Sequence, residues 1–314
     1  MNLAEKSILV TGGAGFLGSA VVRELQTANC TRIFVPRSSA FDLTKEEAVG
    51  RVYEASKPDV VIHLAALVGG IGANRDNPGR FFYDNLMMGT LLMEHGRRSG
   101  VEKFVAIGTV CCYPKHTSVP FKEDDLWSGY PEETNAPYGL AKKMLLVQSQ
   151  AYRHQYDFRS IFLLPVNLYG PGDNFSPATA HVLPALIRRY VEAKDAGLDR
   201  VTNWGSGSPK REFLYVDDLA RAIVLLLEDY DSPETINVGT GEDQSIREIA
   251  ELVAKVVGYE GEIFWDTSKP DGMPRKMLDV SRLKALGWRP TTSLEDGLRH
   301  TVKWFHEHRS EIRS

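Results

Sequence analysis

The sequence lacks the features that mark secreted, membrane-spanning or nucleic-acid-binding proteins. Only three of its 314 residues are cysteines, Cys30, Cys111 and Cys112, which are too few for a disulfide framework. No apolar run approaches the roughly 20 residues that a membrane span requires. Lysine and arginine form no basic patch or tail in a chain of net charge -4, so nucleic acid is not an expected partner.

Two further absences narrow the expectations. The histidines and cysteines show no metal-ligand spacing, so no metal site is predicted. Residues 1–6 lead into a strand pattern without a signal-peptide pattern, and with so few cysteines this predicts a reducing, cytoplasmic location. The 43% hydrophobic content suffices for one large domain or two intimate ones.

Short apolar strand patterns alternate with helical patterns along the chain. The strands are expected at residues 7–10, 33–35, 59–66, 104–107, 159–165 and 236–239. This alternation predicts an α/β fold, a Rossmann-type doubly wound parallel sheet with a smaller C-terminal substrate-binding lobe. We expect residues 1–170 and 213–240 to form the dinucleotide-binding domain, and residues 171–212 and 241–314 the lobe.

A glycine-rich turn follows the first strand. Gly12, Gly15 and Gly18 are spaced Gly-x-x-Gly-x-x-Gly and lead into a helical pattern with Phe16 and Leu17 at its start. Such a turn lets backbone N–H groups approach a diphosphate, whose charge the helix N-terminus favours. The turn predicts a dinucleotide site, and the alternative is a purely structural turn.

The end of the second strand indicates which dinucleotide binds. No acid stands there to bind a ribose 2'-hydroxyl, whereas Arg37 could bind a 2'-phosphate, which favours NADP over NAD. The alternative is an exposed loop arginine. Asp42 and Leu43 follow and are expected to line the adenine pocket.

The stretch from Gly108 to Lys142 carries the candidate chemistry. It starts after a buried strand with Thr109 and ends in a helical segment, 138–156, that begins with Tyr138 and places Lys142 four residues later on the same face. A nearby ammonium lowers the pKa of a phenol. With the hydroxyl of Thr109, the pair is suited to protonating an alkoxide beside a hydride donor. The alternative is a surface tyrosine with an unrelated lysine.

The remaining segments give local expectations. His63 is interpreted as a packed strand residue, and residues 81–98 as a helix. Dense Gly, Pro, Asp and Asn at residues 166–175 break the alternation, and residues 202–213 form a turn-rich segment. Asp217 or Asp218 is expected to cap a helix, and Ser245 another that runs through residue 257; a last helix surrounds Trp304.

Six motifs occur in an order that indicates a known family. They are His63-Leu64-Ala65-Ala66 with the loop 68–74, Cys111-Cys112-Tyr113-Pro114, Asn135-Ala136-Pro137-Tyr138, the run from Asn167 to Phe175, His181-Val182-Leu183-Pro184-Ala185-Leu186, and Asp271-Gly272-Met273-Pro274-Arg275-Lys276. Over almost its whole length the chain resembles the extended short-chain dehydrogenase/reductases, the NAD-dependent epimerase/dehydratase family. It is most similar to the members that epimerise C3 and C5 of a GDP-4-keto-6-deoxy sugar and reduce C4 with NADPH, giving GDP-L-fucose.

The resemblance implies a role for each matching position. Tyr138 would protonate the C4 oxygen, Lys142 would hold the nicotinamide ribose, and Thr109 would replace the usual serine. Cys111 and His181 would be the base and acid of epimerisation. Further cofactor contacts are implied for Gly12, Gly15, Phe16, Leu17, Arg37, Asp42, Leu43, Leu64, Ala65, Ala66, Pro165, Asn167, Leu168 and His181. Substrate contacts are implied for Asn167, Arg189, Trp204, Arg211 and Asp271.

The residue types suit this chemistry. A C4 ketone acidifies the protons on C3 and C5, and ordinary cysteine and histidine pKa values lie on either side of neutral pH. If Cys111 and Cys112 continue the strand, they face opposite ways, so only one can reach the site. The resemblance selects Cys111; its alternative is a buried packing cysteine, and that of His181 an ordinary helix-start residue.

Several positions depart from the family pattern and keep alternatives open. Thr109-Val110 stands for the usual Ser-Ser, Leu67 for a common lysine, and Ala14 for a common arginine. A 4,6-dehydratase usually has Asp-Glu where this chain has Val110-Cys111, which argues against elimination. A 4-epimerase, a related reductase, an epimerase of another keto sugar, or a non-enzymatic nucleotide-binding protein are the other readings. By resemblance, the helices at residues 81–98 and 138–156 would form a homodimer surface.

Overall fold

The computed structural model describes residues 1–177, 179–310 and 312. The chain divides into two compact units. The first comprises Met1–Thr117, Glu123–Pro165 and Asp217–Val238, and the second comprises Ser118–Lys122, Val166–Val216 and Gly239–Ser314. Among the described residues, no helix has the length and apolar character needed to cross a membrane.

The first unit is built on a parallel sheet whose strands run in the order β10-β5-β4-β3-β1-β2. Every residue of the two neighbouring strands β4 and β5 is buried, as expected for a parallel sheet covered on both faces. The strands are β1 (Ser7–Thr11), β2 (Arg32–Phe34), β3 (Val60–His63), β4 (Lys103–Ile107), β5 (Ser160–Pro165) and β10 (Ile236–Val238).

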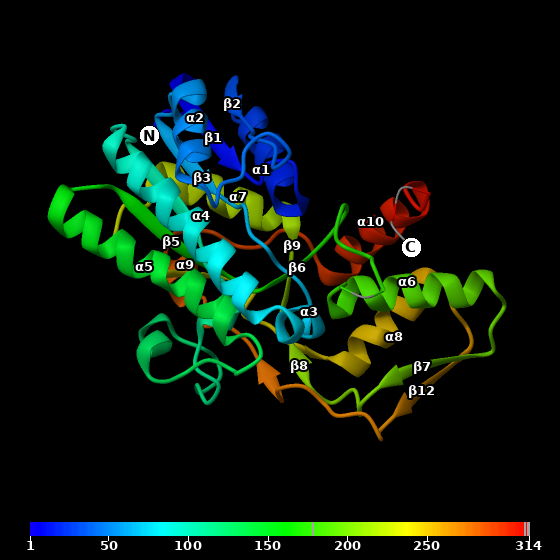
Figure 1. Ribbon diagram of the computed structural model, residues 1–314. Coiled ribbons are helices and arrows are strands. Elements are labelled where there is room, and N and C mark those ends of the chain that lie inside the picture. Colours follow the sequence, from blue (N-terminus) through cyan, green and yellow to red (C-terminus); the bar gives the residue numbers. More distant parts are fainter. Residues whose placement is uncertain (178, 311, 313–314) are drawn as a thin grey trace. The chain divides into compact units, whose positions relative to one another are not determined.

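Helices cover this sheet in two groups. The helices α4 and α5 run side by side (Figure 1), and Gly89 leaves room for Leu145 between them, since an added Cβ would lie 2.5 Å from the Leu145 side chain. The Arg23–Asp217 ion pair at 2.7 Å joins α1 to α7. The elements are α1 (Phe16–Thr27), α2 (Glu46–Ser56), α3 (Ile71–Asp76), α4 (Pro78–Arg98), α5 (Ala136–Tyr156), α7 (Val216–Asp229), and the 3-10 turns η1 (Leu3–Glu5), η2 (Val110–Cys112) and η3 (Glu123–Trp127).

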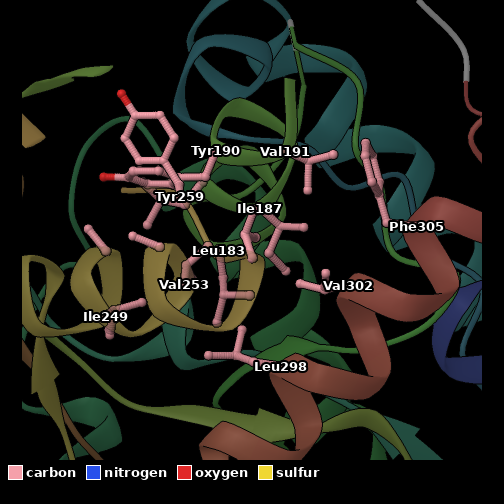
Figure 2. Packing of buried hydrophobic residues seen from close by; sticks show 14 of the residues in the cluster. Leu183, Ile187, Tyr190, Val191, Ile249, Val253, Tyr259, Leu298, Val302 and Phe305 are labelled. Atoms are coloured by element: carbon pink, nitrogen blue, oxygen red, sulfur yellow. The ribbon is translucent and has the colours of Figure 1, made fainter. Parts of the chain in front are cut away.

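The second unit has three helices packed around an apolar core. Figure 2 shows Leu183 and Ile187 of α6, Val253 of α8, and Leu298 and Val302 of α10 gathered in this core. Small sheets surround it: β6 pairs with β9, β7 pairs with β12, and β8 lies between β11 and β13. The elements are α6 (Val182–Asp195), α8 (Ile246–Val257), α9 (Ser281–Ala285), α10 (Leu294–Glu307), β6 (Asn167–Tyr169), β7 (Arg200–Trp204), β8 (Lys210–Arg211), β9 (Phe213–Tyr215), β11 (Gln244–Ser245), β12 (Glu262–Asp266) and β13 (Arg275–Lys276).

The architecture confirms the predicted Rossmann-type α/β fold, with corrections in detail. The capping box of Ser245 and Glu248 confirms the predicted start of α8. Asp217 and Asp218 lie inside the first turn of α7 and do not cap it. The segment 202–213 is less irregular than expected, because it contains the end of β7 and all of β8. Residues 166–170 and 213–216 group with the second unit, because β6 and β9 pair with each other and not with the large sheet.

Candidate active site

The loops that follow β1, β3 and β4 meet at one edge of the large sheet. Thr11, the last residue of β1, pairs in register with His63 at the end of β3, which in turn pairs with Ala106 of β4. In an open parallel sheet this edge, beyond the carboxyl ends of the strands, is where ligands bind. The predicted glycine turn, residues 64–66 and Thr109 all lie on these loops.

The glycine turn leaves no space for side chains. Gly12 has a φ of +72°, and a Cβ added there would lie 2.7 Å from the backbone nitrogen of Ala65. Gly15 is the N-cap of α1 and has an extended backbone conformation. Phe16 and Leu17 follow it in the first helical turn. A bare backbone turn below a helix N-terminus is the cradle that a dinucleotide diphosphate requires, so these residues fit such a group.

His63 fixes the neighbouring loop from inside the sheet. Its Nδ1 lies 2.8 Å from the Oγ1 of Thr11, and that oxygen accepts a weak bond from the backbone N–H of Ala65 at 3.4 Å. The ring is fully buried, and burial followed by the nearby charge of Lys142 holds its pKa well below the ordinary value. His63 is therefore a packed residue, as expected, and it links the two loops of the cradle.

Cys111 lies in the 3-10 turn η2 and not on a strand, which corrects the alternation expected for the cysteine pair. Thr109 caps this turn by accepting the backbone N–H of Cys111 on its Oγ1 at 3.3 Å. Cys112 is fully buried and donates its thiol to the carbonyl of Gly139 at 3.3 Å. Cys111 is partly exposed, so of the two thiols it is the one that a substrate can reach. The difference arises from burial in the turn and not from the alternation of side chains along a strand.

The turn η2 and the helix α5 touch through their backbones. A Cβ on Gly139 would overlap the carbonyl oxygen of Cys111, so glycine is required for this approach. Gly139 follows Tyr138 directly, so this contact brings the backbone of Cys111 next to the start of α5, and Cys111 is near enough for its charge to affect the pKa of Tyr138. Lys142 lies one turn further along the same helix.

The electrostatics of these residues differ from the expectation. Lys142 is 2% exposed, and burial lowers its pKa to about 8. Burial, followed by the charge of Cys111, raises the pKa of Tyr138 above its ordinary value. The predicted lowering by Lys142 is wrong for this arrangement, because loss of water around the phenol outweighs any attraction to the ammonium.

A buried polar link, not predicted from sequence, anchors the same turn. The hydroxyl of Tyr113 donates to Oδ1 of Asn237 at 2.7 Å, and the backbone N–H of Asn237 donates to Glu123 at 2.9 Å. Tyr113 belongs to the same sequence motif as Cys111, and this was the only indication in the sequence that Tyr113 has a role near the site. The link ties the end of η2 to the edge strand β10.

The remaining predicted cofactor positions of the first unit follow the strand ends. Arg37 is exposed after β2, and Leu43 is 8% exposed. Asp42 accepts the hydroxyl of Thr44 at 2.6 Å, which lowers the pKa of its carboxyl. Leu64, Ala65 and Ala66 form the loop after β3, and Pro165 ends β5.

The second unit holds His181 and all five predicted substrate residues. His181 is the N-cap of α6, without a side-chain capping bond, and loss of hydration lowers its pKa. Arg189 donates to Oδ1 of Asn203 at 2.7 Å, and Trp204 is 72% exposed. Asp271 accepts both the backbone N–H and the hydroxyl of Ser206, at 2.9 and 2.7 Å.

Asn167 and Arg211 approach a common residue of the second unit. The amide of Asn167, which precedes Leu168 in β6, donates to the carbonyl oxygen of Glu212 at 3.2 Å. Arg211 precedes Glu212 in the chain, and burial lowers the pKa of its guanidinium. Arg211 also lines a cavity of about 260 Å³ together with Tyr169, Phe213, Thr240, Glu242, Gln244 and residues 290–294.

These features define a class. A bare-backbone cradle at the first strand–helix junction, with a tyrosine and lysine one turn apart on α5, is the arrangement of a dinucleotide-dependent oxidoreductase of the short-chain type. A family model confirms the class: residues 8–239 match the NAD dependent epimerase/dehydratase family. The chain belongs to this family, as the resemblance in its motifs predicted.

Comparison with individual proteins shows which members of the family this chain is similar to. The chain is 45% identical over 306 residues to GDP-L-fucose synthase 1 of Arabidopsis thaliana, covering 97% of this chain and 95% of that protein. The crystal structure of a GDP-L-fucose synthetase from Naegleria fowleri bound to NADP matches with a TM-score of 0.91 and 30% identity, covering 99% of this chain and 97% of that one. A GDP-6-OMe-4-keto-L-xylo-heptose reductase from C. jejuni matches with a TM-score of 0.90 and 29% identity, covering 97% and 99%.

Proposed function

We propose that the protein is an NADP-dependent epimerase/reductase that converts a GDP-4-keto-6-deoxy sugar to GDP-L-fucose. The observation that carries this is the backbone contact between Gly139, which follows Tyr138, and Cys111, whose thiol is partly exposed. Lys142 lies one turn further along the helix that Tyr138 begins. A proton donor alone would serve a simple reductase, whereas an added thiol suits proton removal next to a ketone. The full-length likeness to GDP-L-fucose synthase 1 supports the same substrate class.

The cofactor residues fit NADP. Gly12 and Gly15 would hold the diphosphate, and Arg37 would bind the 2'-phosphate. Lys142 would hold the nicotinamide ribose. When bound, NADPH supplies the hydride that reduces C4.

Tyr138 completes the reduction by donating the proton of its hydroxyl to the C4 oxygen. Because burial raises its pKa, the phenol stays protonated across neutral pH and is ready to act as an acid. The proton lost to the C4 alkoxide is regained from solvent. The ketone thereby gains a hydride and a proton and becomes an alcohol.

Epimerisation requires no change of oxidation state. The thiolate of Cys111 takes a proton from C3 or C5, the ketone stores the electron pair as an enolate, and a proton returns to the other face. His181 is the proposed source of that proton. Burial lowers its pKa, so at neutral pH the ring is mostly neutral and has to take up a proton from solvent before it can donate one.

Assembly and location are part of the proposal. The helices α4 and α5 expose apolar side chains at Phe82, Tyr83, Val147 and Tyr156, which supports a homodimer through this face. Light scattering of the purified protein would test it, and a monomer at micromolar concentration would exclude it. The free cysteines support a reducing, cytoplasmic location.

Two readouts on one substrate test the function. With a GDP-4-keto-6-deoxy sugar in deuterated water, the wild type should oxidise NADPH and place deuterium at C3 and C5. The variant Cys111→Ser should lose deuterium incorporation by about 10²–10⁴-fold and keep some reduction of the unepimerised ketone. Deuterium appearing at the wild-type rate in this variant would remove Cys111 from the mechanism.

A reductase acting on a different GDP-keto sugar is the second candidate. The likeness to the C. jejuni heptose reductase and the apolar Val110 beside Thr109 favour it. It predicts oxidation of NADPH without deuterium at C3 or C5. The same experiment therefore separates the two.

A further inference from the structure

A fully buried carboxylate in the second unit has no role in the mechanism above. Glu212 is 0% exposed, and burial raises the pKa of its carboxyl. It is the single residue between β8, which ends at Arg211, and β9, which begins at Phe213. A carboxylate without exposure is costly unless several donors reach it, so its partners show what it holds together.

Two loops donate to the two oxygens of this carboxylate. Oε1 accepts the backbone N–H groups of Thr240 at 2.6 Å and Gly241 at 2.7 Å, and the hydroxyl of Thr240 at 3.3 Å. Oε2 accepts the backbone N–H of Leu278 at 2.7 Å. The loop at 239–241 and the segment after β13 are thus joined through one side chain.

The backbone of Glu212 makes two further connections. Its N–H donates to the carbonyl of Lys276 at 3.3 Å, which extends the pairing of β8 with β13. Its carbonyl accepts the amide of Asn167 at 3.2 Å. The position of Arg211 relative to Asn167 therefore depends on how Glu212 is held.

The space around the carboxylate is fitted to it. A Cβ added to Gly239 would overlap Oε1 of Glu212, so this glycine leaves the room that the carboxylate occupies. The guanidinium of the preceding residue, Arg211, lies close to Gly272: a Cβ added to this glycine would be 3.2 Å from its Nη2. No cation pairs with Glu212 in the part of the chain that the structure describes, and its donors are backbone groups and one hydroxyl.

We infer that Glu212 is a positioning residue for nucleotide-sugar binding: its carboxylate fixes β8 so that Arg211 is held in place for the GDP part of the substrate. This inference rests on the proposed function. It predicts a selective effect, because the glycine cradle and Arg37 belong to the first unit, whereas Arg211 belongs to the second. Asn167, which is also an expected cofactor contact, bonds to the backbone carbonyl of Glu212, and a change of the carboxylate leaves that carbonyl in place. Loss of the carboxylate should weaken GDP binding and spare the dinucleotide.

The variant Glu212→Gln keeps the shape but replaces one acceptor oxygen by an NH₂ group that faces backbone N–H donors. We expect the Kd of GDP and the KM of the nucleotide sugar to rise about tenfold or more, corresponding to loss of one or two charge-assisted bonds. The Kd of NADPH should stay within about twofold, and kcat should change less than KM. Glu212→Asp keeps the charge but reaches only one of the two loops, so it should rescue part of the GDP affinity.

Val253→Ala is the matched control. Val253 is fully buried in the apolar core of the same unit and makes no hydrogen bond to Glu212 through its side chain, so the variant lowers stability without removing the carboxylate. Its Kd for GDP should equal the wild-type value. If it loses GDP affinity as Glu212→Gln does, or if Glu212→Gln loses GDP and NADPH equally, the inference is overturned.

The outcomes also separate this inference from the proposed function. If wild-type protein binds NADPH but not GDP, the proposed substrate is wrong. If wild-type protein binds GDP and Glu212→Gln binds it equally well, the substrate stands and the positioning role is wrong. Should Glu212→Gln fail to fold, Gly239→Ala displaces the same carboxylate and is expected to give the same selective loss of GDP.

Discussion

The two units hold their polar residues in different ways. In the first, the decisive approaches are backbone against backbone: Gly12 against Ala65, and Gly139 against Cys111. In the second, the carboxylate of Glu212 gathers three backbone N–H groups from two loops, whereas in the first Glu123 accepts one, from Asn237. The first unit should therefore be damaged by the smallest added atom, and the second by the loss of one acceptor.

The largest expected effect comes from removing chemistry in the first unit without disturbing its backbone. Tyr138→Phe keeps the ring that packs edge-on against Phe81 at 6.5 Å and removes the proton donor. We expect C4 reduction to fall by about 10²–10⁴-fold with NADPH binding retained, because the contacts of the cradle are unchanged. Stopped-flow NADPH oxidation would measure this, and a fall below tenfold would mean that another group donates the proton.

A single methyl group should break the first unit's backbone contact. Gly139→Ala forces the added Cβ onto the Cys111 carbonyl, and overpacking of this kind costs about 1–3 kcal/mol. Reduction and epimerisation should fall together. Gly79→Ala in α4 is the control, since nothing lies within 4 Å of its added Cβ and alanine favours helix by up to about 1 kcal/mol. Urea unfolding should give opposite signs for the two variants.

Arg37 tests the comparison from outside, because it takes part neither in a close backbone approach nor in a cluster of backbone N–H donors around one side chain. Its exposed guanidinium should act by charge alone, so Arg37→Ala is expected to weaken NADPH about tenfold and NADH little. Fluorescence titration with both nucleotides measures the ratio. Equal losses would show that Arg37 does not read the 2'-phosphate.

The smallest effect concerns Lys103, the first unit's own side-chain anchor. Its buried ammonium donates to the carbonyls of Leu226, Leu227 and Tyr230 at the end of α7, and burial lowers its pKa to about 8. Between pH 8 and the ordinary lysine pKa, the unfolded chain keeps a proton that the folded chain has released, so the contribution of Lys103 to the free energy of unfolding rises with pH.

Comparison with Lys103→Met would detect this rise. Between pH 7.5 and about pH 9.5, the free energy of unfolding of the wild type should rise by about 1 kcal/mol relative to that of the variant. Chemical denaturation at the two pH values would measure it. A constant difference would mean that Lys103 keeps its proton throughout.

The parts of the molecule that could be predicted from sequence are those set by local patterns. Continuous apolar runs predicted β4 and β5, and the helix spacing placed Tyr138 and Lys142 on α5. The 3-10 turn at Cys111 and the raised pKa of Tyr138 were not predicted, because both depend on the packing of α5 against that turn. Nor were Asn237 as the partner of Tyr113 and Leu278 as a partner of Glu212, which lie 124 and 66 residues away in the chain. Patterns of sequence periodicity concern residues within one helix or strand, so they do not predict contacts between residues so far apart in the chain.

The meeting of Gly139 with the carbonyl of Cys111 has a consequence for how the enzyme could diverge. The backbone segments that carry the thiol and the phenol share one alignment, since the turn η2 and the helix α5 cannot slide past each other without colliding. A new sugar therefore has to be admitted by exchanging the side chains that surround these two groups. If Cys111 and Tyr138 react as proposed, a change in the backbone position of one residue requires a matching change in that of the other.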